Sequence, residues 1–269
     1  MDFLSSFLLL DPKGAIALAE RGLMLQATLF MLIVAVPVFF LTFFFAWRYR
    51  ASNKKANYQP DWEHSRMEEL IWWAIPFEIV LVLGALTWTS THELDPRMPI
   101  QAEQPAMVVQ VVALEWKWLF IYPEQGIATL NYLALPVGQP VRFDVTSDAP
   151  MNSFWIPNLG GQIYAMTGMT NSLNLVADEE GKFIGRSANY SGEGFAQMKF
   201  TAEATSREEF DAWVKEVRTY PDTLTSQSYE RLSTPSIPYA PVYYSLVEPN
   251  IYNKILSQFT GDASGQRAH

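Results

Sequence analysis

Two long apolar runs near the N-terminus constrain this chain more than any other feature. The first, residues 22–47, reads GLMLQATLFMLIVAVPVFFLTFFFAW and contains no charged residue. About 20 apolar residues, at ~1.5 Å of helical rise each, cross the hydrocarbon core of a bilayer. The run therefore predicts a transmembrane helix, which Pro37 should kink. The second run, residues 69–90, has Trp72 near one end and Trp88 near the other, as is typical of membrane interfaces.

The basic residues around the two runs predict their direction across the membrane. The connecting segment 48–68 carries Arg48, Arg50, Lys54, Lys55 and Arg66. The outer flanks are poorer in positive charge and carry only Lys13, Arg21 and Arg97. Because lysine and arginine are retained on the cytoplasmic side, we expect segment 48–68 to be cytoplasmic. Segment 1–21 and everything from residue 91 onward would then lie in the periplasm of a bacterial inner membrane.

Two carboxyl groups of the second run require separate interpretations. Glu69 lies at the cytoplasmic end, where an ordinary interfacial charge is the simplest interpretation from the residues alone. Glu78 lies nine residues further on, ~13.5 Å deeper along a helix. A carboxyl at that depth is functional or paired by default, so we expect Glu78 to be neutral and hydrogen-bonded. At ~100° per residue the two side chains point about 180° apart on a straight helix, which argues against one shared proton path unless a kink at Pro76 reduces that angle. If Glu69 faces a partner subunit, we expect Glu78 to face the first span or lipid.

Beyond the second run, the pattern changes to short stretches rich in β-forming residues. Between 141 and 145, apolar and polar residues alternate as in a half-buried strand, and the runs 107–122, 171–178 and 196–204 are also β-rich. Turn signals such as Pro157-Asn-Leu-Gly separate these runs. Segment 91–205 is therefore predicted to be an all-β sandwich of Greek-key type. Trp116 and Trp118, two residues apart, are expected to share one strand face and to pack there.

The C-terminal segment, 206–269, combines a helix with an aromatic-rich region. Ser206 and Glu209 fit a capping box, and an apolar stripe follows at helical spacing until Pro221. The region 223–259 is rich in tyrosine and proline and predicts an extended segment packed on a surface. The last nine residues predict a disordered tail.

The segment 184–198, IGRSANYSGEGFAQM, has the glycines of a tight ligand-bearing loop but lacks metal ligands. Copper and zinc sites need thiolate, imidazole, thioether or carboxylate groups at fixed spacing. The chain has no Cys and only 3 His, none of them in this region. Met198 is the one soft donor, so we interpret the segment as a binding loop without its ligands. A net charge of -9 also argues against a nucleic-acid partner.

Two spans followed by such a domain resemble subunit II of the haem–copper oxidases. In the cytochrome c-oxidising branch, a cupredoxin fold holds a binuclear copper centre through a His-Ser-Phe-type segment and a Cys-Ser-Glu-x-Cys-Gly-x-x-His-x-x-Met loop. Aligned on Gly192, this sequence has Asn152 at the first His, Ser187 and Ser191 at the two Cys, Asn189 at the Glu, Phe195 at the second His and Met198 at the Met. Every ligand but the methionine is replaced.

That departure is typical of the quinol-oxidising branch, such as cytochrome bo-type ubiquinol oxidases, which this chain resembles nearly throughout. The matching stretches are LLDPKG, AWRYRASNK, IYPEQGIAT, MNSFWIP, QIYAM, YSGEGF and the Tyr-rich C-terminal segment. The resemblance implies a subunit without a redox centre of its own, in a proton-pumping complex that oxidises ubiquinol and reduces oxygen. It places haems and a copper ion in subunit I, and implies contacts with subunits I, III and IV and with membrane lipids.

The resemblance also changes the interpretation of the two acids. Glu69 precedes Pro76 by seven residues, which is where the family presents a carboxylate at the mouth of the K proton channel. Glu78 stands where the family usually has an apolar residue, so the resemblance assigns it no role. The quinol branch also commonly begins with a lipoprotein signal and a lipidated Cys. The opening MDFLSSFLLLDPK has no basic n-region and predicts an apolar flap at the membrane surface rather than a signal peptide.

Two other functions fit parts of the pattern. One is a cytochrome c oxidase subunit II with an atypical copper site, which would keep chelator-resistant copper in its external domain. The other is a membrane-tethered β-sandwich that acts only as a binding or assembly module, which would purify without an attached haem protein.

Overall fold

The computed structural model describes residues 8–57, 63–237 and 240–260 of the 269-residue chain. These residues divide into two compact units. One is a helical unit, Gly22–Asp95, and the other combines Met1–Arg21 with Pro96–His269.

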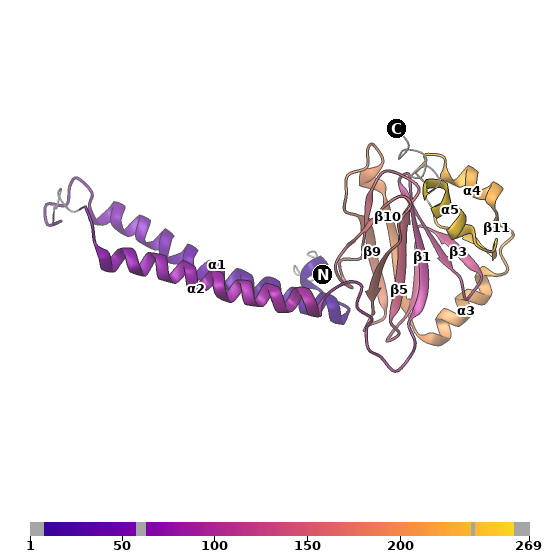
Figure 1. Cartoon of the computed structure of the whole chain (residues 1–269), viewed down its shortest axis with the longest axis horizontal. Helices are drawn as coiled ribbons and strands as arrows, with labels where there is room; N and C mark the ends of the chain where they lie inside the picture. The colour runs from indigo at the N-terminus through magenta and orange to yellow at the C-terminus, as the bar shows by residue number, and fades with distance from the viewer. Residues whose placement is uncertain (1–7, 58–62, 238–239, 261–269) are drawn as a thin grey trace, which may run out of the picture. The chain divides into compact units, whose positions relative to one another are not determined.

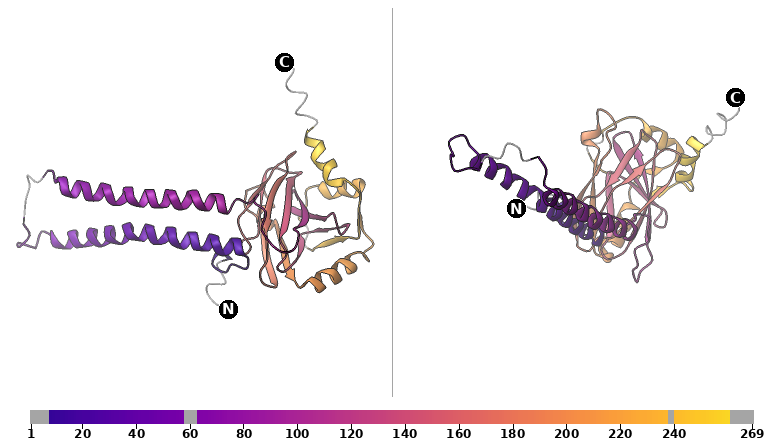
Figure 2. Two further views of the ribbon diagram at one scale, coloured as in Figure 1. Left: turned by 60° about the horizontal axis from the view of Figure 1, so that its bottom comes forward. Right: turned by 60° about the vertical axis from the view of Figure 1, so that its left-hand side comes forward.

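Two long helices, α1 (Ala15–Arg48) and α2 (Arg66–Glu93), form a hairpin and run side by side in both views of Figure 2. Each contains one of the predicted apolar runs, and each is long and apolar enough to cross a bilayer. Hydroxyl groups within the helices donate to carbonyls four residues earlier, as Thr28 does to Met24 and Thr87 does to Leu83, at 2.7 Å each. This satisfies the hydroxyls where a bilayer offers no water.

The sandwich of the β domain consists of two large sheets packed face to face (Figure 1), and a separate two-stranded sheet joins β11 (Thr223–Leu224) to β13 (Leu246–Val247). The first has the order β12 (Val242–Tyr244), β3 (Ile127–Leu130), β2 (Lys117–Tyr122), β1 (Met107–Leu114), β5 (Val141–Ser147) and β8 (Asn171–Leu175). The second has the order β4 (Tyr132–Pro136), β10 (Lys199–Thr205), β9 (Gly181–Ser187), β6 (Asn152–Trp155) and β7 (Ile163–Ala165). β1 runs parallel to β5 and β10 parallel to β4, so the chain must cross between distant strands rather than follow a simple meander. The predicted β-sandwich is confirmed.

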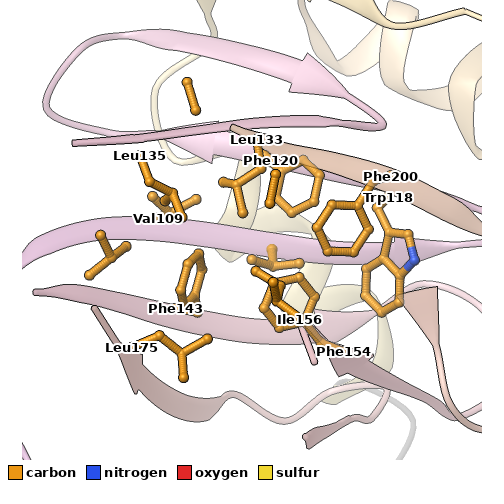
Figure 3. Close-up of a cluster of buried hydrophobic side chains, with 14 of the residues drawn as sticks. Val109, Trp118, Phe120, Leu133, Leu135, Phe143, Phe154, Ile156, Leu175 and Phe200 are labelled. Atoms are coloured by element: carbon orange, nitrogen blue, oxygen red, sulfur yellow. The ribbon is translucent and has the colours of Figure 1, made fainter. Parts of the chain in front are cut away.

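Aromatic side chains from both sheets fill the space between them (Figure 3). The rings of Phe154 and Phe200 stack at 5.3 Å, and the indole of Trp118 meets the ring of Phe154 edge-on at 5.4 Å. All three side chains are buried, and such ring pairs contribute about 0.5–1.5 kcal/mol beyond the area they bury. The core therefore fixes how β2 of the first sheet lies against β6 and β10 of the second.

The run 107–122 forms a hairpin rather than an uninterrupted strand. β1 and β2 are antiparallel and joined by Glu115 and Trp116 alone. Two-residue hairpins require positive φ, which Asn-Gly usually supplies, so nothing in the sequence marks this turn. Trp116 adopts φ 64° and lies in the turn. The prediction that it shares a strand face with Trp118 is therefore wrong at this residue.

The segment after the sandwich contains more helix than the sequence indicated. The capping box at Ser206 is confirmed at the start of α3 (Arg207–Val217). The tyrosine-rich region then forms β11 (Thr223–Leu224), α4 (Ser226–Ser233), β13 (Leu246–Val247) and α5 (Ile251–Thr260) in addition to β12. It packs on the outer face of the first sheet, away from β9 and β10 (Figure 1), and Tyr229 and Tyr252 are buried there. The predicted disordered tail lies outside the described residues.

The residues before the first span are part of the β domain. After the short helix η2 (Leu8–Leu10), the amide of Lys13 donates to the carbonyl of Asn158 at 2.7 Å, and the amide of Asp178 donates back to the carbonyl of Lys13 at 2.9 Å. Gly14 lies so close to the backbone that a Cβ there would meet the carbonyl oxygen of Val176 at 2.3 Å. The N-terminal segment is thus bound between two connections of the sandwich.

Candidate functional site

The positions that correspond to copper ligands meet at one end of the second sheet. Strands β6 and β9 are antiparallel, with Phe154 opposite Ser187, and the amide of Ala188 continues the pairing by donating to the carbonyl of Ser153 at 3.1 Å. This register brings Asn152, the first residue of β6, beside the end of β9. The loop that follows β9 contains the short helix η3 (Phe195–Gln197) and ends at Met198.

Asn152 and Ser187 are buried and bound to each other. The Oγ of Ser187 donates to the Oδ1 of Asn152 at 2.8 Å, and the Nδ2 of Asn152 donates to the carbonyl of Pro150 at 2.7 Å. A buried amide or hydroxyl without a partner would destabilise the fold. Here the hydroxyl of Ser187 provides a donor for the amide oxygen of Asn152, and that oxygen provides an acceptor for the hydroxyl.

The remaining positions of the loop are held by similar contacts. The Nδ2 of Asn189 donates to the carbonyl of Met151 at 2.8 Å, and the ring of Phe195 contacts the ring of Tyr190 at 5.6 Å. The backbone carbonyl of Met198 accepts a hydrogen bond from the amide of Ser187 at 3.1 Å, while its side chain is buried in the core. The Oγ of Ser191 is buried and has no partner among the described residues.

Trp116 packs against this loop from the β1–β2 turn. Its Nε1 donates to the carbonyl of Ser191 at 3.0 Å. Its ring lies so close to Gly194 that a Cβ there would meet Cγ of the indole at 2.3 Å. Of the loop glycines, only Gly192 has positive φ, at 103°, whereas Gly185 and Gly194 leave room for an aromatic ring. Two of the three glycines are therefore needed for close packing against an aromatic ring, and only Gly192 has the positive φ predicted for a tight ligand-bearing loop.

These residues do not fit a copper centre. The amide and hydroxyl groups of Asn152, Ser187 and Asn189 bond to the protein itself, the hydroxyl of Ser191 is a hard oxygen donor, and the one soft donor, Met198, is buried. Copper in such a fold needs thiolate and imidazole ligands. Among the described residues, no group of three or more His, Cys, Asp or Glu side chains is placed to hold a metal ion.

Two contacts that the sequence did not reveal attach the aromatic-rich segment to the sandwich. The buried Lys117 donates from Nζ to the carbonyl of Thr234 at 2.7 Å and to the Oγ of Ser236 at 2.5 Å, and burial lowers its pKa. The hydroxyl of Tyr229 donates to Oδ2 of Asp148 at 2.5 Å. Burial raises the pKa of both Tyr229 and Asp148. In the sequence, the feature that could have indicated the Lys117 contact is the position of this lysine within a run of apolar strand residues.

The two acids of the second helix lie far apart along it. Glu69, with Glu68, occupies the first turn of α2, where the exposed amide groups of a helix favour negative charge. Glu78 lies near the middle of the helix and is exposed. Neither carboxylate makes a hydrogen bond or ion pair with another described residue.

Two apolar helices, a β-sandwich with ligand-like loops and an aromatic-rich C-terminal segment define the class of the oxidase subunits II. Residues 124–205 match the family described as cytochrome c oxidase subunit II, periplasmic domain, and residues 218–262 match the COX aromatic rich motif.

Relatives that match nearly the whole of this chain narrow the class to one kind of oxidase. The chain is 52% identical to cytochrome bo(3) ubiquinol oxidase subunit 2 of Pseudomonas putida, over 97% of this chain and 83% of that protein. It is 49% identical to ubiquinol oxidase subunit 2 of Acetobacter aceti, over 93% of this chain and 82% of that protein. The chain belongs to the subunit 2 family of cytochrome bo(3)-type ubiquinol oxidases.

Among solved structures, the periplasmic domain of subunit II of cytochrome oxidase from Bradyrhizobium japonicum aligns with a TM-score of 0.41 at 23% identity, covering 44% of this chain and 96% of that one. The two apolar helices and the match to a periplasmic domain fit a protein of the inner membrane.

Proposed function

We propose that this chain is the non-redox subunit II of a proton-pumping ubiquinol oxidase. In this proposal ubiquinol is oxidised at subunit I, and electrons pass through the haems and the copper ion of that subunit to oxygen. Quinol dissolves in the membrane, so no electron relay through the periplasmic domain is required. Segments 1–21 and 91–269 would lie in the periplasm and segment 48–68 in the cytoplasm.

The observation that carries this proposal is the contact between Ser187 and Asn152. The side chains that replace a Cys and a His are 2.8 Å apart and fully engaged with the protein. A site that had merely lost its metal would leave unpartnered polar groups at several ligand positions, whereas among the buried side chains that the structure describes at these positions only Ser191 lacks a partner. The β domain would then cap the outer face of subunit I, and the two helices would pack against that subunit. The chain would also contact subunits III and IV and membrane lipids.

The electron route can be tested on the native complex. We expect turnover with a ubiquinol analogue and none with a soluble cytochrome c. Metal analysis should find one copper per complex, and that copper should stay with subunit I when this subunit is removed. Chelator-resistant copper retained by this subunit would contradict the proposal and would favour a cytochrome c oxidase with an atypical site.

The second part of the proposal assigns Glu69 to the cytoplasmic entrance of the K proton channel. It is supported by the position of Glu69 in the first turn of α2, exposed and without a partner among the described residues. There its carboxylate could collect protons and pass them to subunit I.

Glu69→Gln should slow oxygen reduction roughly tenfold, which corresponds to about 1.4 kcal/mol in the activation barrier, because an amide cannot carry the proton. Haem content and assembly should not change. The matched control is Glu68→Gln, which removes the neighbouring carboxylate of the same turn and should leave turnover unchanged. Equal turnover in the wild type and in Glu69→Gln would refute the channel role.

A further inference from the structure

Glu78 differs from the other polar side chains of α2. The hydroxyls of Thr87 and Thr89 bond to backbone carbonyls of their own helix, at 2.7 Å and 3.1 Å. Glu78 is exposed, lies near the middle of the apolar helix and bonds to no other described residue. A carboxyl surrounded by hydrocarbon is strongly destabilising unless a polar group contacts it, so its partner must come from outside this chain.

The first helix cannot cover this carboxyl. The side of α2 that faces α1 is marked by Ile79 and Leu83, which line an apolar groove together with residues of α1 such as Phe30 and Val34. At ~100° per residue, Glu78 points about 100° away from Ile79 and about 140° away from Leu83. Its carboxyl therefore lies on a part of the surface of α2 that α1 leaves open.

The surface around Glu78 has the composition of a helix contact. One stripe of α2, here called the Glu78 stripe, consists of the residues within about 40° of Glu78 around the helix: Ile71, Ala74, Glu78, Val82, Ala85 and Thr89. The exposed Ile75 and Leu81 flank it on its two sides, at about 60°. Its alanines stand four residues before and seven residues after Glu78, and all six side chains are exposed. The neighbouring side of the helix carries the bulky, exposed Trp73, Phe77 and Trp88 instead. Small residues permit two membrane helices to approach closely, and a buried polar group then bonds across the contact.

We propose, building on the proposed function, that the Glu78 stripe is the docking face for a transmembrane helix of another subunit of the oxidase. This helix presents a hydrogen-bond donor, such as a basic, hydroxyl or amide side chain, at the depth of Glu78. Lipid tails offer no donor, so the carboxyl selects a protein partner. Glu78 also lies ~13.5 Å from Glu69 along the helix, so this contact is separate from the proton entrance proposed at Glu69.

Two substitutions at Glu78 test the hydrogen bond. Glu78→Leu removes the acceptor, and we expect roughly tenfold less of one partner subunit to remain in the purified complex, because the partner's donor is left buried and unpaired. Glu78→Gln keeps a carbonyl acceptor and should retain that subunit. Wild-type subunit content in Glu78→Leu would overturn the proposal. Glu69→Gln and its turnover provide an independent measurement, so either proposal can fail alone.

Cross-linking identifies what lies on the stripe. Because the chain contains no Cys, a single cysteine at Ala74 or Ala85 can carry a photoreactive group in the membrane-embedded complex. We expect an adduct with another subunit from both positions, and far less from the matched Phe77→Cys, which lies on the bulky side. Adducts with lipid alone would overturn the proposal, as would adducts with a second copy of this chain.

Discussion

Gly185 lies under the ring of Phe200, which is buried between the sheets. A Cβ at Gly185 would meet Cζ of that ring at 2.0 Å, closer than any real contact. Phe200 cannot move aside easily, because its ring stacks on Phe154. The missing side chain of Gly185 thus leaves room for the ring of its cross-strand partner Phe200, in the sheet that carries the degenerate copper site.

We therefore expect Gly185→Ala to lower the free energy of unfolding by about 1–3 kcal/mol, the usual cost of overpacking a core. Thermal or denaturant unfolding of the full chain in detergent would measure it. In a Phe200→Leu background the same substitution should cost much less, since the two residues are in contact. Gly84→Ala in α2 is the matched control, because a Cβ there meets nothing within 4 Å. Equal losses in the two backgrounds would disprove the packing explanation.

Among the elements, the segment before α1 is held by backbone contacts rather than by an apolar face. Besides the contacts of Lys13, the amide of Ala17 in the first turn of α1 donates to the carbonyl of Leu159 at 3.2 Å. The start of the first apolar helix is thereby fixed to the connection 156–161 of the β domain.

Substitution at Gly14 should release this segment. Gly14→Val places a side chain against the carbonyl of Val176, which cannot yield without moving a connection of the sandwich. We expect the amides of Lys13, Ala17 and Asp178 to exchange hydrogen faster, by roughly tenfold or more for each ~1.4 kcal/mol of lost contact. Gly22→Ala, further along the same helix and in open space, should leave their exchange unchanged.

The aromatic-rich segment gives the β domain a dependence on alkaline pH. Burial and the contact with Asp148 hold the pKa of Tyr229 well above its ordinary value of 10.0, and burial raises the pKa of Tyr252 to about 12. The unfolded chain loses these protons near pH 10 while the folded protein keeps them. The stability that they contribute is therefore complete below pH 10 and is lost as the pH rises above it.

Tyr229→Phe should flatten this loss. Each buried tyrosine contributes a slope of ~1.4 kcal/mol per pH unit above pH 10, so removing one should reduce the slope by about that amount. Urea unfolding between pH 9 and pH 11 would measure it. Tyr164→Phe, at an exposed tyrosine, should leave the slope unchanged. An unaltered slope in Tyr229→Phe would show that this residue ionises in the folded protein as it does in the unfolded chain.

In the β domain as a whole, the first sheet is buried on both faces. Its inner face meets the second sheet, and its outer face, with Val112, Leu119 and Ile121, is covered by the aromatic-rich segment. The two cores share β1 and β2, so neither core can be lost without exposing a strand of the other.

Truncation after Arg218 should therefore destabilise the domain as well as the segment removed. The exposed face would be a contiguous apolar patch, which favours aggregation. We expect the truncated chain to accumulate poorly and to elute as aggregates, with less subunit I recovered alongside it. A truncated chain that stays monodisperse and assembles normally would show that the segment is dispensable for the fold.

Much of this molecule could be predicted from its sequence, because the predictions rested on local patterns. The two apolar runs, the β-rich runs of the sandwich and the capping box at Ser206 depend on residues a few positions apart. The missing ligands could be read directly from Ser187 and Asn152. The turn at Glu115 and Trp116 could not be predicted, because its backbone conformation is imposed by the pairing of two strands rather than by a turn residue.

The sequence by itself determined that two helices can span a membrane, that a β domain follows them, and that this domain lacks the side chains of a copper site. These properties depend on composition and periodicity. Only the tertiary structure decided that Asn152 and Ser187 bond to each other, that Trp116 packs on their loop, that Lys117 holds the aromatic-rich segment and that Glu78 points away from α1. Each of these features depends on residues far apart in the chain, or on which face of a helix another helix covers. A local sequence pattern carries no information about either.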